Sequence, residues 1–285
     1  MSAYTSTHTS DTKGLVEAVS SSLAALYRRR WLAIYFAQRE LARSRRISYL
    51  GFLWALLSPL LQIVLLTLVF SEIVGIRFPR EVTGDSALNF GLFLYCGLVP
   101  YLAFSETLSK SMASIRSNTS LVQKVIFPLE ILPLSRAVTV LVDALLGSIM
   151  LILVVALLVH RLEWTVLLLP ALMAVQLLFT LGLGYLSAVI GTYVPDIRNT
   201  VHVLVRALFF ATPIVWPAER VPESLSFLVD YNPLAFLVTA YRDLILEGTL
   251  PDLSWTLWFC VFSGALCIIG FVVFVRVKQN FADVL

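Results

Sequence analysis

The sequence predicts an all-α polytopic membrane protein with six transmembrane helices, an N-terminal amphipathic interfacial helix, and re-entrant or outer-gate helices between spans five and six. The composition supports this fold class, because 59% of the residues are hydrophobic and only 14% are charged. The apolar residues also fall in runs close to the roughly 20 residues that a helix needs to cross the hydrocarbon core. The small net charge of +3 gives no support to nucleic-acid binding.

The N-terminal part of the chain is polar and then basic. We expect residues 1–22, which contain no apolar stretch, to form a disordered cytoplasmic N-terminus without a cleavable signal peptide. Residues 23–48 form an amphipathic interfacial helix and basic linker, because Leu26, Trp31 and Ile34 keep helical spacing while the arginines lie mostly off that stripe. Such a helix lies along an anionic membrane surface.

Six apolar runs define a transmembrane domain over residues 49–276, followed by a cytoplasmic tail at 277–285. The runs cover residues 49–74, 88–111, 134–159, 164–192, 201–216 and 253–275. Pro59 predicts a kink in the first span, and Pro213 interrupts the short fifth run.

The distribution of Lys and Arg predicts the orientation of these spans. With six spans both termini share one side, and that side carries sixteen Lys and Arg residues against five on the other. By the positive-inside rule, both termini and the loop after span two are therefore cytoplasmic.

The outer hairpin, residues 217–252, is the largest loop on the opposite side. It contains two apolar amphipathic pieces, 221–229 and 234–246, each too short to span and separated by the turn at Asn232 and Pro233. Short helices at membrane depth are tolerated against protein or a water-filled cavity, so a re-entrant hairpin or lid is predicted. A pair of external surface helices is the alternative.

Residues 114–133 are a polar-to-amphipathic interruption between two long apolar runs. Ser117 or Asn118 is expected to cap a short helix that Pro128 ends. Its apolar face carries Leu121, Val122, Val125 and Ile126, and its polar face carries Gln123 and Lys124. Such a helix offers its polar edge to a partner, and a plain connecting loop is the alternative.

Three acidic residues lie within the spans: Glu72, Glu106 and Asp143. Because a charge at mid-membrane costs a few kcal/mol, each is expected to face protein or water. A structural hydrogen bond or ion pair, for example with Lys110 or Arg136, is favoured over a proton relay or a substrate contact. No metal site is predicted, because the histidines are scattered and the three cysteines lie within apolar runs.

Catalytic motifs are missing from the sequence. No G-x-x-x-x-G-K-[ST] segment is present, so the chain has no P-loop for ATP phosphates, and neither G-x-S-x-G nor H-E-x-x-H occurs. Gly182 and Gly184 lie within an apolar span, where they favour close helix packing over phosphate binding. We therefore expect neither an enzymatic active site nor a cofactor bound by this chain.

Aromatic residues gather around spans two and five and the outer hairpin. The candidates for a channel or gate are Tyr101, Phe104, Phe210, Trp216, Tyr231 and Phe236. Flat aromatic rings suit the C–H faces of sugar rings and leave the hydroxyls to water, which fits a path for a glycan. Interfacial aromatic belts have the same composition and are the alternative.

Several segments, in this order and spacing, carry a family resemblance. They are RELARSRRISYLGFLWALLSPLLQ (39–62), GLVPYLAFSETL (97–108), SNTSLVQKVIFPLEILPLS (117–135), DALLG (143–147), VPDIRNTV (194–201), TPIVWPAERVPE (212–223) and YNPLAFLVTAYRDLILEG (231–248). From about residue 31 to the end, the chain resembles the membrane subunits of ABC-2 type polysaccharide exporters, the Wzm/TagG-like permeases of O-antigen, capsule and teichoic-acid export.

The resemblance implies a homodimer in the bacterial cytoplasmic (inner) membrane that binds two copies of a separate ABC ATPase subunit, which holds ATP and Mg. Residues 117–127 would be the coupling helix seated in that partner. A polyprenyl-diphosphate-linked glycan would pass between the two copies, along spans one and five. This chain departs from the family pattern at Glu130, where Arg or Lys is expected nearby.

Two sets of site residues follow. The implied ATPase-coupling residues are Ser117, Asn118, Leu121, Gln123, Lys124 and Phe127. The candidates for a lipid-diphosphate entrance are Arg43, Arg45 and Arg46, for which a topology anchor is the alternative.

The function expected from these observations is that of the channel-forming subunit of an ABC exporter of a polyprenyl-diphosphate-linked polysaccharide. An ABC-2 exporter of a drug or small lipid shares the architecture. A secondary transporter, by contrast, would depend on an ion gradient and on Asp143 or Glu106. A membrane glycosyl or acyl transferase would turn over without ATP.

Overall fold

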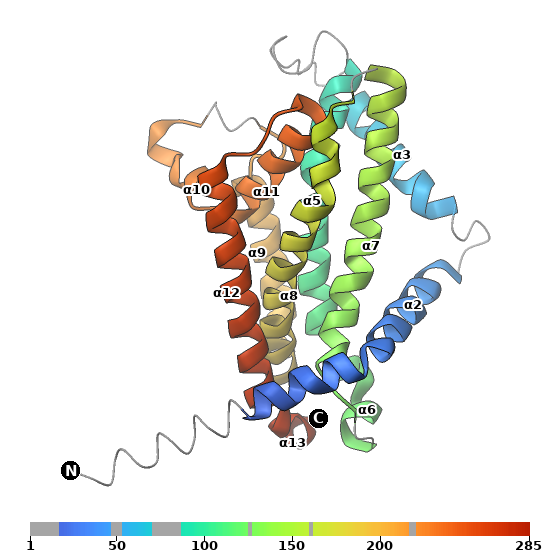
Figure 1. Ribbon diagram of the computed structural model, residues 1–285, viewed down its shortest axis with the longest axis vertical. Coiled ribbons are helices and arrows are strands. Elements are labelled where there is room, and N and C mark those ends of the chain that lie inside the picture. Colours follow the sequence, from blue (N-terminus) through green and yellow to red (C-terminus); the bar gives the residue numbers. More distant parts are fainter. Residues whose placement is uncertain (1–16, 47–52, 70–86, 125–126, 160–161, 217–220) are drawn as a thin grey trace.

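The fold is a bundle of helices, shown in Figure 1 as a computed structural model. The structure describes residues 17–46, 53–69, 87–124, 127–159, 162–216 and 221–285. The α-helices are α2 (Arg30–Arg46), α3 (Leu53–Leu66), α5 (Ala87–Met112), α6 (Thr119–Lys124), α7 (Ile131–Val154), α8 (Leu169–Tyr193), α9 (Ile197–Ala211), α10 (Phe227–Asp230), α11 (Pro233–Arg242), α12 (Leu253–Val277) and α13 (Phe281–Val284). No strand occurs in these ranges, so the all-α prediction is confirmed for them.

Four helical stretches are long and apolar enough to cross a membrane. They cover Phe90–Met112, Ile131–Leu158, Trp164–Tyr193 and Leu253–Val284, which confirms the predicted spans two, three, four and six. The predicted spans one and five correspond to α3 and α9, which are shorter helices of 14 and 15 residues. Part of the predicted first span, together with Glu72, lies outside the described residues.

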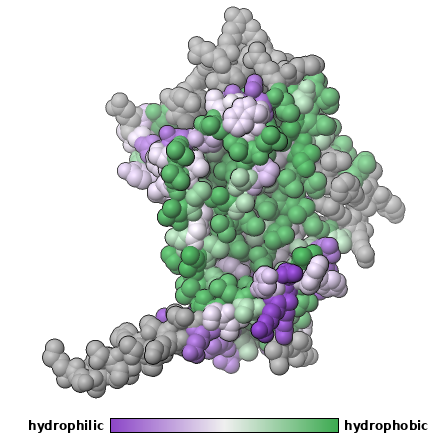
Figure 2. Space-filling view, in the orientation of Figure 1, coloured by the Kyte–Doolittle hydropathy of each residue, from purple (hydrophilic) through white to green (hydrophobic). Residues whose placement is uncertain are grey.

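The spanning helices give the molecule an apolar middle and two polar ends. α5, α7, α8 and α12 run side by side, and their outer surfaces form a broad hydrophobic belt in Figure 2. Hydrophilic side chains gather at both ends of this belt. We call these the α6 end, where α6, α2 and the C-terminus meet, and the α11 end, where α10 and α11 lie.

The most extensive helix pair among the described elements is α8 with α12. Their backbones touch at two glycines: a Cβ atom on Gly182 would lie 2.6 Å from the carbonyl oxygen of Leu266, and one on Gly270 would lie 2.3 Å from the carbonyl oxygen of Gly182. Neither position has room for a larger residue. The interpretation of Gly182 as a packing glycine is therefore confirmed.

Two large hydrophobic cores fill the bundle, one toward each end, and a small third cluster contains Phe90, Phe93 and Leu94. The core near the α11 end includes Tyr241 and Phe259, and it joins α5, α8, α11 and α12. The core at the α6 end includes Ile115, Tyr185 and Phe281, and joins the loop after α5 to α8, α12 and α13. Segments far apart in the sequence thus meet at the α6 end.

The N-terminal helix begins earlier than expected. Residues 17–28 are already helical, and α2 follows after a break at Arg29. The prediction of disorder therefore does not hold for residues 17–22, because Val19 packs against the core at the α6 end and orders this turn. α2 lies across the bundle at this end, as Figure 1 shows, and its Trp31 is 69% exposed.

In its described part, the outer hairpin has a 3₁₀ turn, Glu223–Leu225, followed by α10 and α11. Asn232 caps α11, since its side-chain oxygen accepts the backbone N–H of Leu234 at 3.0 Å, and Pro233 occupies the first turn. α11 is only ten residues long, yet Leu234, Leu237 and Tyr241 are fully buried. A helix too short to span is therefore held inside the bundle by protein contacts.

Candidate functional site

The segment between α5 and α7 folds into the short helix that the sequence predicts. A 3₁₀ turn, Arg116–Asn118, leads directly into α6. Ser117 and Asn118 do not act as the expected caps: the hydroxyl of Ser117 (3.3 Å) and the amide of Asn118 (2.8 Å) both donate to the carbonyl oxygen of Ser114. These bonds hold the turn against the end of α5.

The inner face of this segment is anchored in the core at the α6 end. Ile115 is completely buried, and Leu121 and Val122 pack against the same core. Arg116 fixes the segment to α8, because its Nε and Nη2 atoms donate to the carbonyl oxygen of Thr192 at 3.2 and 2.7 Å. A displacement of this segment would therefore be passed directly to α5 and α8.

The outer face of the segment is open. Ser117, Ser120 and Gln123 are exposed, which matches the polar edge predicted for a partner. Lys124 ends α6, but its side chain lies outside the described residues, as do Val125 and Ile126. The predicted two-faced character thus holds for the residues that the structure describes.

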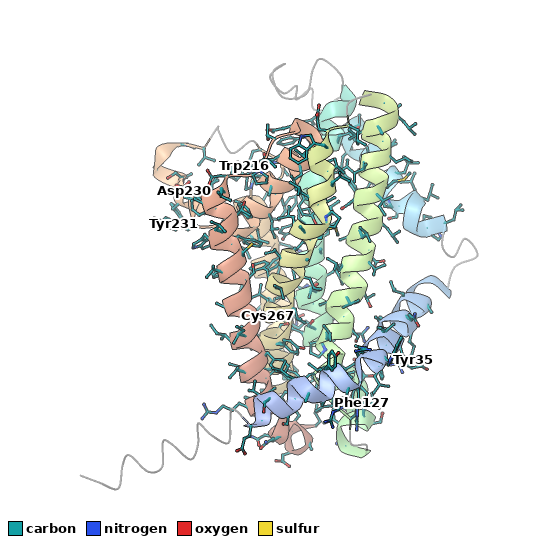
Figure 3. All side chains as sticks on the ribbon, viewed as in Figure 1. Tyr35, Phe127, Trp216, Asp230, Tyr231 and Cys267 are labelled. Atoms are coloured by element: carbon teal, nitrogen blue, oxygen red, sulfur yellow. The ribbon has the colours of Figure 1, made fainter. Side chains whose placement is uncertain are left out.

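Phe127 connects the segment to the N-terminal helix. Its ring lies 5.2 Å from the ring of Phe36 on α2, and the guanidinium of Arg39 lies 4.5 Å above the same Phe36 ring. Figure 3 shows Phe127 beneath α2, at the same end as Tyr35. Glu40 of α2 also forms a salt bridge with Arg136 of α7. The segment after α5 and the N-terminal helix α2 therefore lie together at the α6 end.

Glu130, the departure from the family pattern, does not face outward. The residue is 1% exposed, and its carboxylate pairs with the ammonium of Lys278, which also donates to the hydroxyl of Ser22 at 2.8 Å. Its other oxygen, Oε2, is buried and has no hydrogen-bond partner among the described residues. The charge of Glu130 is therefore used inside the protein and adds nothing to the outer charge of the α6 end.

Two of the three predicted intramembrane acids line one cavity. Glu106 and Asp143 line a space of about 260 Å³ between α3, α5 and α7, together with Gln62 and Tyr95. Glu106 pairs with Lys110 at 2.5 Å, which confirms the predicted structural ion pair for this residue. Arg136, the other predicted partner, pairs with Glu40 instead.

The candidate aromatics separate into two groups. Tyr101 and Phe104 are 5% exposed and pack within the protomer, so their rings do not present a surface to a path outside it. Phe210 and Tyr231 are 71% and 80% exposed. Trp216 and Phe236 are partly buried, and Figure 3 shows Trp216 and Tyr231 at the α11 end. A role in a channel stays a prediction for the exposed rings.

The remaining predicted residues are placed only in part. Arg43, Arg45 and Arg46 lie in the last turns of α2, and their side chains are outside the described residues. No group of three potential metal ligands occurs in the described ranges.

Arg242 is a site residue that sequence reasoning assigned to an external loop. It is 4% exposed, and its guanidinium donates to the carbonyl oxygens of Pro213 (2.7 Å), Ile214 (2.8 Å) and Phe93 (3.4 Å). It also lies 3.4 Å from the ring centroid of Phe93. One buried side chain thus joins α11 to α5 and to the segment after α9. The sequence did contain a signal for this buried role, because Arg242 is the single Arg in the apolar amphipathic piece 234–246.

Four long apolar helices define the class of the protein, which is a multi-pass helical membrane protein. At one end of these helices lies the short helix α6, with one face packed on the core and the other exposed. Residues 33–246 match the ABC-2 type transporter family, and the chain belongs to this family.

Its curated relatives include two O-antigen export system permease proteins RfbA. The protein from Myxococcus xanthus is 32% identical over 261 residues, covering 90% of this chain and 96% of the relative. The one from Klebsiella pneumoniae is 27% identical, covering 89% and 95%. A polysialic acid transport protein KpsM from Escherichia coli is 25% identical, covering 71% and 76%.

Proposed function

We propose that this chain is the channel-forming membrane subunit of an ABC exporter that moves a polyprenyl-diphosphate-linked polysaccharide across the bacterial inner membrane. A separate ATPase subunit binds ATP and Mg and drives it. The observation that carries the proposal is the similarity over nearly the whole chain to permeases named for O-antigen export. Two copies of the chain and two of the ATPase form the complex, with both termini in the cytoplasm.

The α6 end is the docking surface for the ATPase in this proposal. Its exposed residues Ser117, Ser120 and Gln123 contact the partner, while Ile115 and Arg116 pass the resulting displacement to α5 and α8. A coupling element must interact differently with the two states of the partner in order to shift their balance. Closure of the ATPase around α6 meets this condition.

The docking surface is tested with Ser120→Trp, which places a bulky side chain on the exposed face of α6 without touching its inner contacts. We expect the amount of ATPase that co-purifies with the tagged chain to fall at least about tenfold, together with glycan export, because hot-spot contacts dominate such interfaces. Ser224→Trp, at an exposed serine of the α11 end, is the matched control and should retain both. Normal ATPase recovery with Ser120→Trp overturns the assignment.

The α11 end is the outer gate in this proposal. Phe210 and Tyr231 present their rings to the path, and the buried α11 acts as a re-entrant support. The double variant Phe210→Ala and Tyr231→Ala should lower export of the polymer several-fold while leaving ATPase recovery normal. Leu250→Ala, an exposed apolar residue at the same end, is the control. Unchanged polymer export in the double variant would instead favour an exporter of a drug or small lipid.

A further inference from the structure

A basic flank runs along α9. Arg198, His202 and Arg206 recur at every fourth residue and so lie on successive turns of the helix. Both arginines are exposed and His202 is partly buried. Neither arginine forms a salt bridge with any residue in the described part of the chain.

The upper part of this flank lies at the middle of the membrane span. The hydroxyl of Tyr101 donates to the carbonyl oxygen of Val205, and Tyr101 is the middle residue of the Phe90–Met112 span. Further along, Arg242 bonds to Pro213, Ile214 and Phe93, which brings the segment after α9 level with the far part of α5. Arg206, next to Val205, is therefore about 14 Å of helix rise from Ile197 and well inside the span.

A guanidinium at this depth has few acceptable surroundings. Exposure to lipid at the bilayer centre costs about 3 kcal/mol even on the mildest insertion scale. Another side of α9 is apolar and exposed, with Leu204 at 57% and Leu208 at 37%, and this side suits lipid or a second copy of the chain. The basic flank is accordingly the side of α9 that faces water.

We propose that Arg198, His202 and Arg206 form an anion ladder that binds the anionic group of the exported substrate as it crosses the membrane. This inference rests on the proposed function and names a chemical class for its substrate. Guanidinium groups bind phosphate and carboxylate oxygens in bidentate fashion. Because successive turns place side chains about 5–6 Å apart at Cβ, one rung takes over the anion before the previous rung releases it. A diphosphate lipid carrier and an acidic polymer both offer this chemistry.

The first experiment measures ATPase activity of the whole transporter complex in nanodiscs, titrated with undecaprenyl diphosphate or with uncharged undecaprenol. We expect Arg206→Met to raise the concentration of undecaprenyl diphosphate needed for half-maximal stimulation about tenfold, as for loss of a charge-assisted hydrogen bond. Arg206→Lys, which keeps the charge, should stay within about threefold of the unmodified chain. The control Leu204→Met, a neutral change on the opposite exposed side of α9, should also respond to undecaprenyl diphosphate as the unmodified chain does.

The second experiment measures export of an acidic polymer by cells that carry Arg206→Met. Together with the first experiment, it separates the two sources of the anion. A weakened response to the bare lipid assigns the ladder to the carrier diphosphate. A normal response to the lipid, with export of an acidic polymer slowed about tenfold, assigns it to the polymer.

Two outcomes overturn the ladder. The first is an Arg206→Met chain that is present at normal level, binds its ATPase, and matches the unmodified chain in both experiments. The second is loss of the homodimer by Arg206→Met in size-exclusion measurements, which assigns Arg206 to an ion pair between copies. An unmodified complex that exports no glycan and ignores the lipid instead contradicts the proposed function itself.

Discussion

The two ends of the bundle are held together by different interactions. At the α6 end, side chains pair with side chains from distant segments: Glu130 with Lys278, and Glu40 with Arg136. At the α11 end, one buried guanidinium, that of Arg242, bonds to backbone carbonyls of two other segments. Each ion pair at the α6 end joins two segments, whereas Arg242 alone joins three segments at the α11 end. Single hydrogen bonds from Asn232 to Thr212 (3.1 Å) and from Thr165 to the carbonyl oxygen of Leu244 (2.8 Å) add to it there.

This difference suits the two tasks in the proposed function. A surface that receives force from a partner has to stay intact when one contact is strained, and several pairs around a common core provide that. A gate has to be released as a unit, and one residue that joins α11, α5 and the segment after α9 allows it. If this interpretation is right, loss of one residue should be more damaging at the α11 end.

The largest effect is expected for Arg242→Met. Several carbonyl groups in the protein interior lose a charged donor, so the variant should be destabilised by about 4 kcal/mol, measured as a lower thermal midpoint of the purified complex. Arg242→Lys should recover about half of the loss, because an ammonium lacks the planar fork of the guanidinium. Thr239→Val, at an exposed position of α11, is the control. A loss no larger than that of the control would contradict the anchoring role of Arg242.

A smaller effect is expected for Lys278→Met. The change leaves the buried Glu130 carboxylate without its cation and should cost about 3 kcal/mol. Adding Glu130→Gln to this variant should restore most of the midpoint, since the unpaired charge is then gone. Arg276 is exposed and lies on α12, two residues before Lys278. As the control, Arg276→Met should shift the free energy of unfolding by less than about 0.5 kcal/mol. Equal effects of the Lys278 and Arg276 variants would contradict the role of the pair.

The pair of Glu40 and Arg136 should contribute least of the three, about 1 kcal/mol, because both side chains are partly exposed, at 20% and 15%. Its contribution should also shrink as salt rises from about 0.05 to about 0.5 M, whereas that of Arg242 should not. The test compares the midpoints of Glu40→Gln and Arg242→Met with the unmodified protein at both salt concentrations. If the midpoint shift caused by Arg242→Met also shrinks at high salt, the two ends do not differ in this way.

The smallest effect concerns acid. The hydroxyl of Ser254 and the backbone N–H of Trp255 donate to the Asp252 carboxylate and hold the pKa of this group below its usual 3.8. Because the folded pKa is lower than the unfolded one, this cap stabilises the start of α12 above the usual pKa and is lost as pH falls through the folded value. Asp252→Asn, which also caps helices, should therefore show a slightly smaller drop of the midpoint between about pH 5 and pH 3. An identical drop in both proteins would show that the cap is not sensitive to pH.

Long apolar runs and amphipathic spacing predicted the four long spans, the short helix after α5 and the packing role of Gly182. The interactions between remote segments could not be predicted. Glu130 looked like a surface charge, since its partner Lys278 is 148 residues away. Arg242 looked like a loop charge, since backbone carbonyls leave no trace in the sequence. Residues 17–22 looked disordered, because their order depends on a core that distant helices complete.

The contact between Gly182 and Gly270 has a consequence for the order in which the protein is made. α8 emerges from the ribosome well before α12, with α9 and the hairpin between them. Until α12 arrives, the backbone groove at Gly182 stays open to the lipid. α12 is thus the helix that closes the bundle, and the residues that follow it bring Lys278 to Glu130 and Phe281 into the core at the α6 end. The core beneath α6 is therefore complete only after α12 and the residues that follow it have been made.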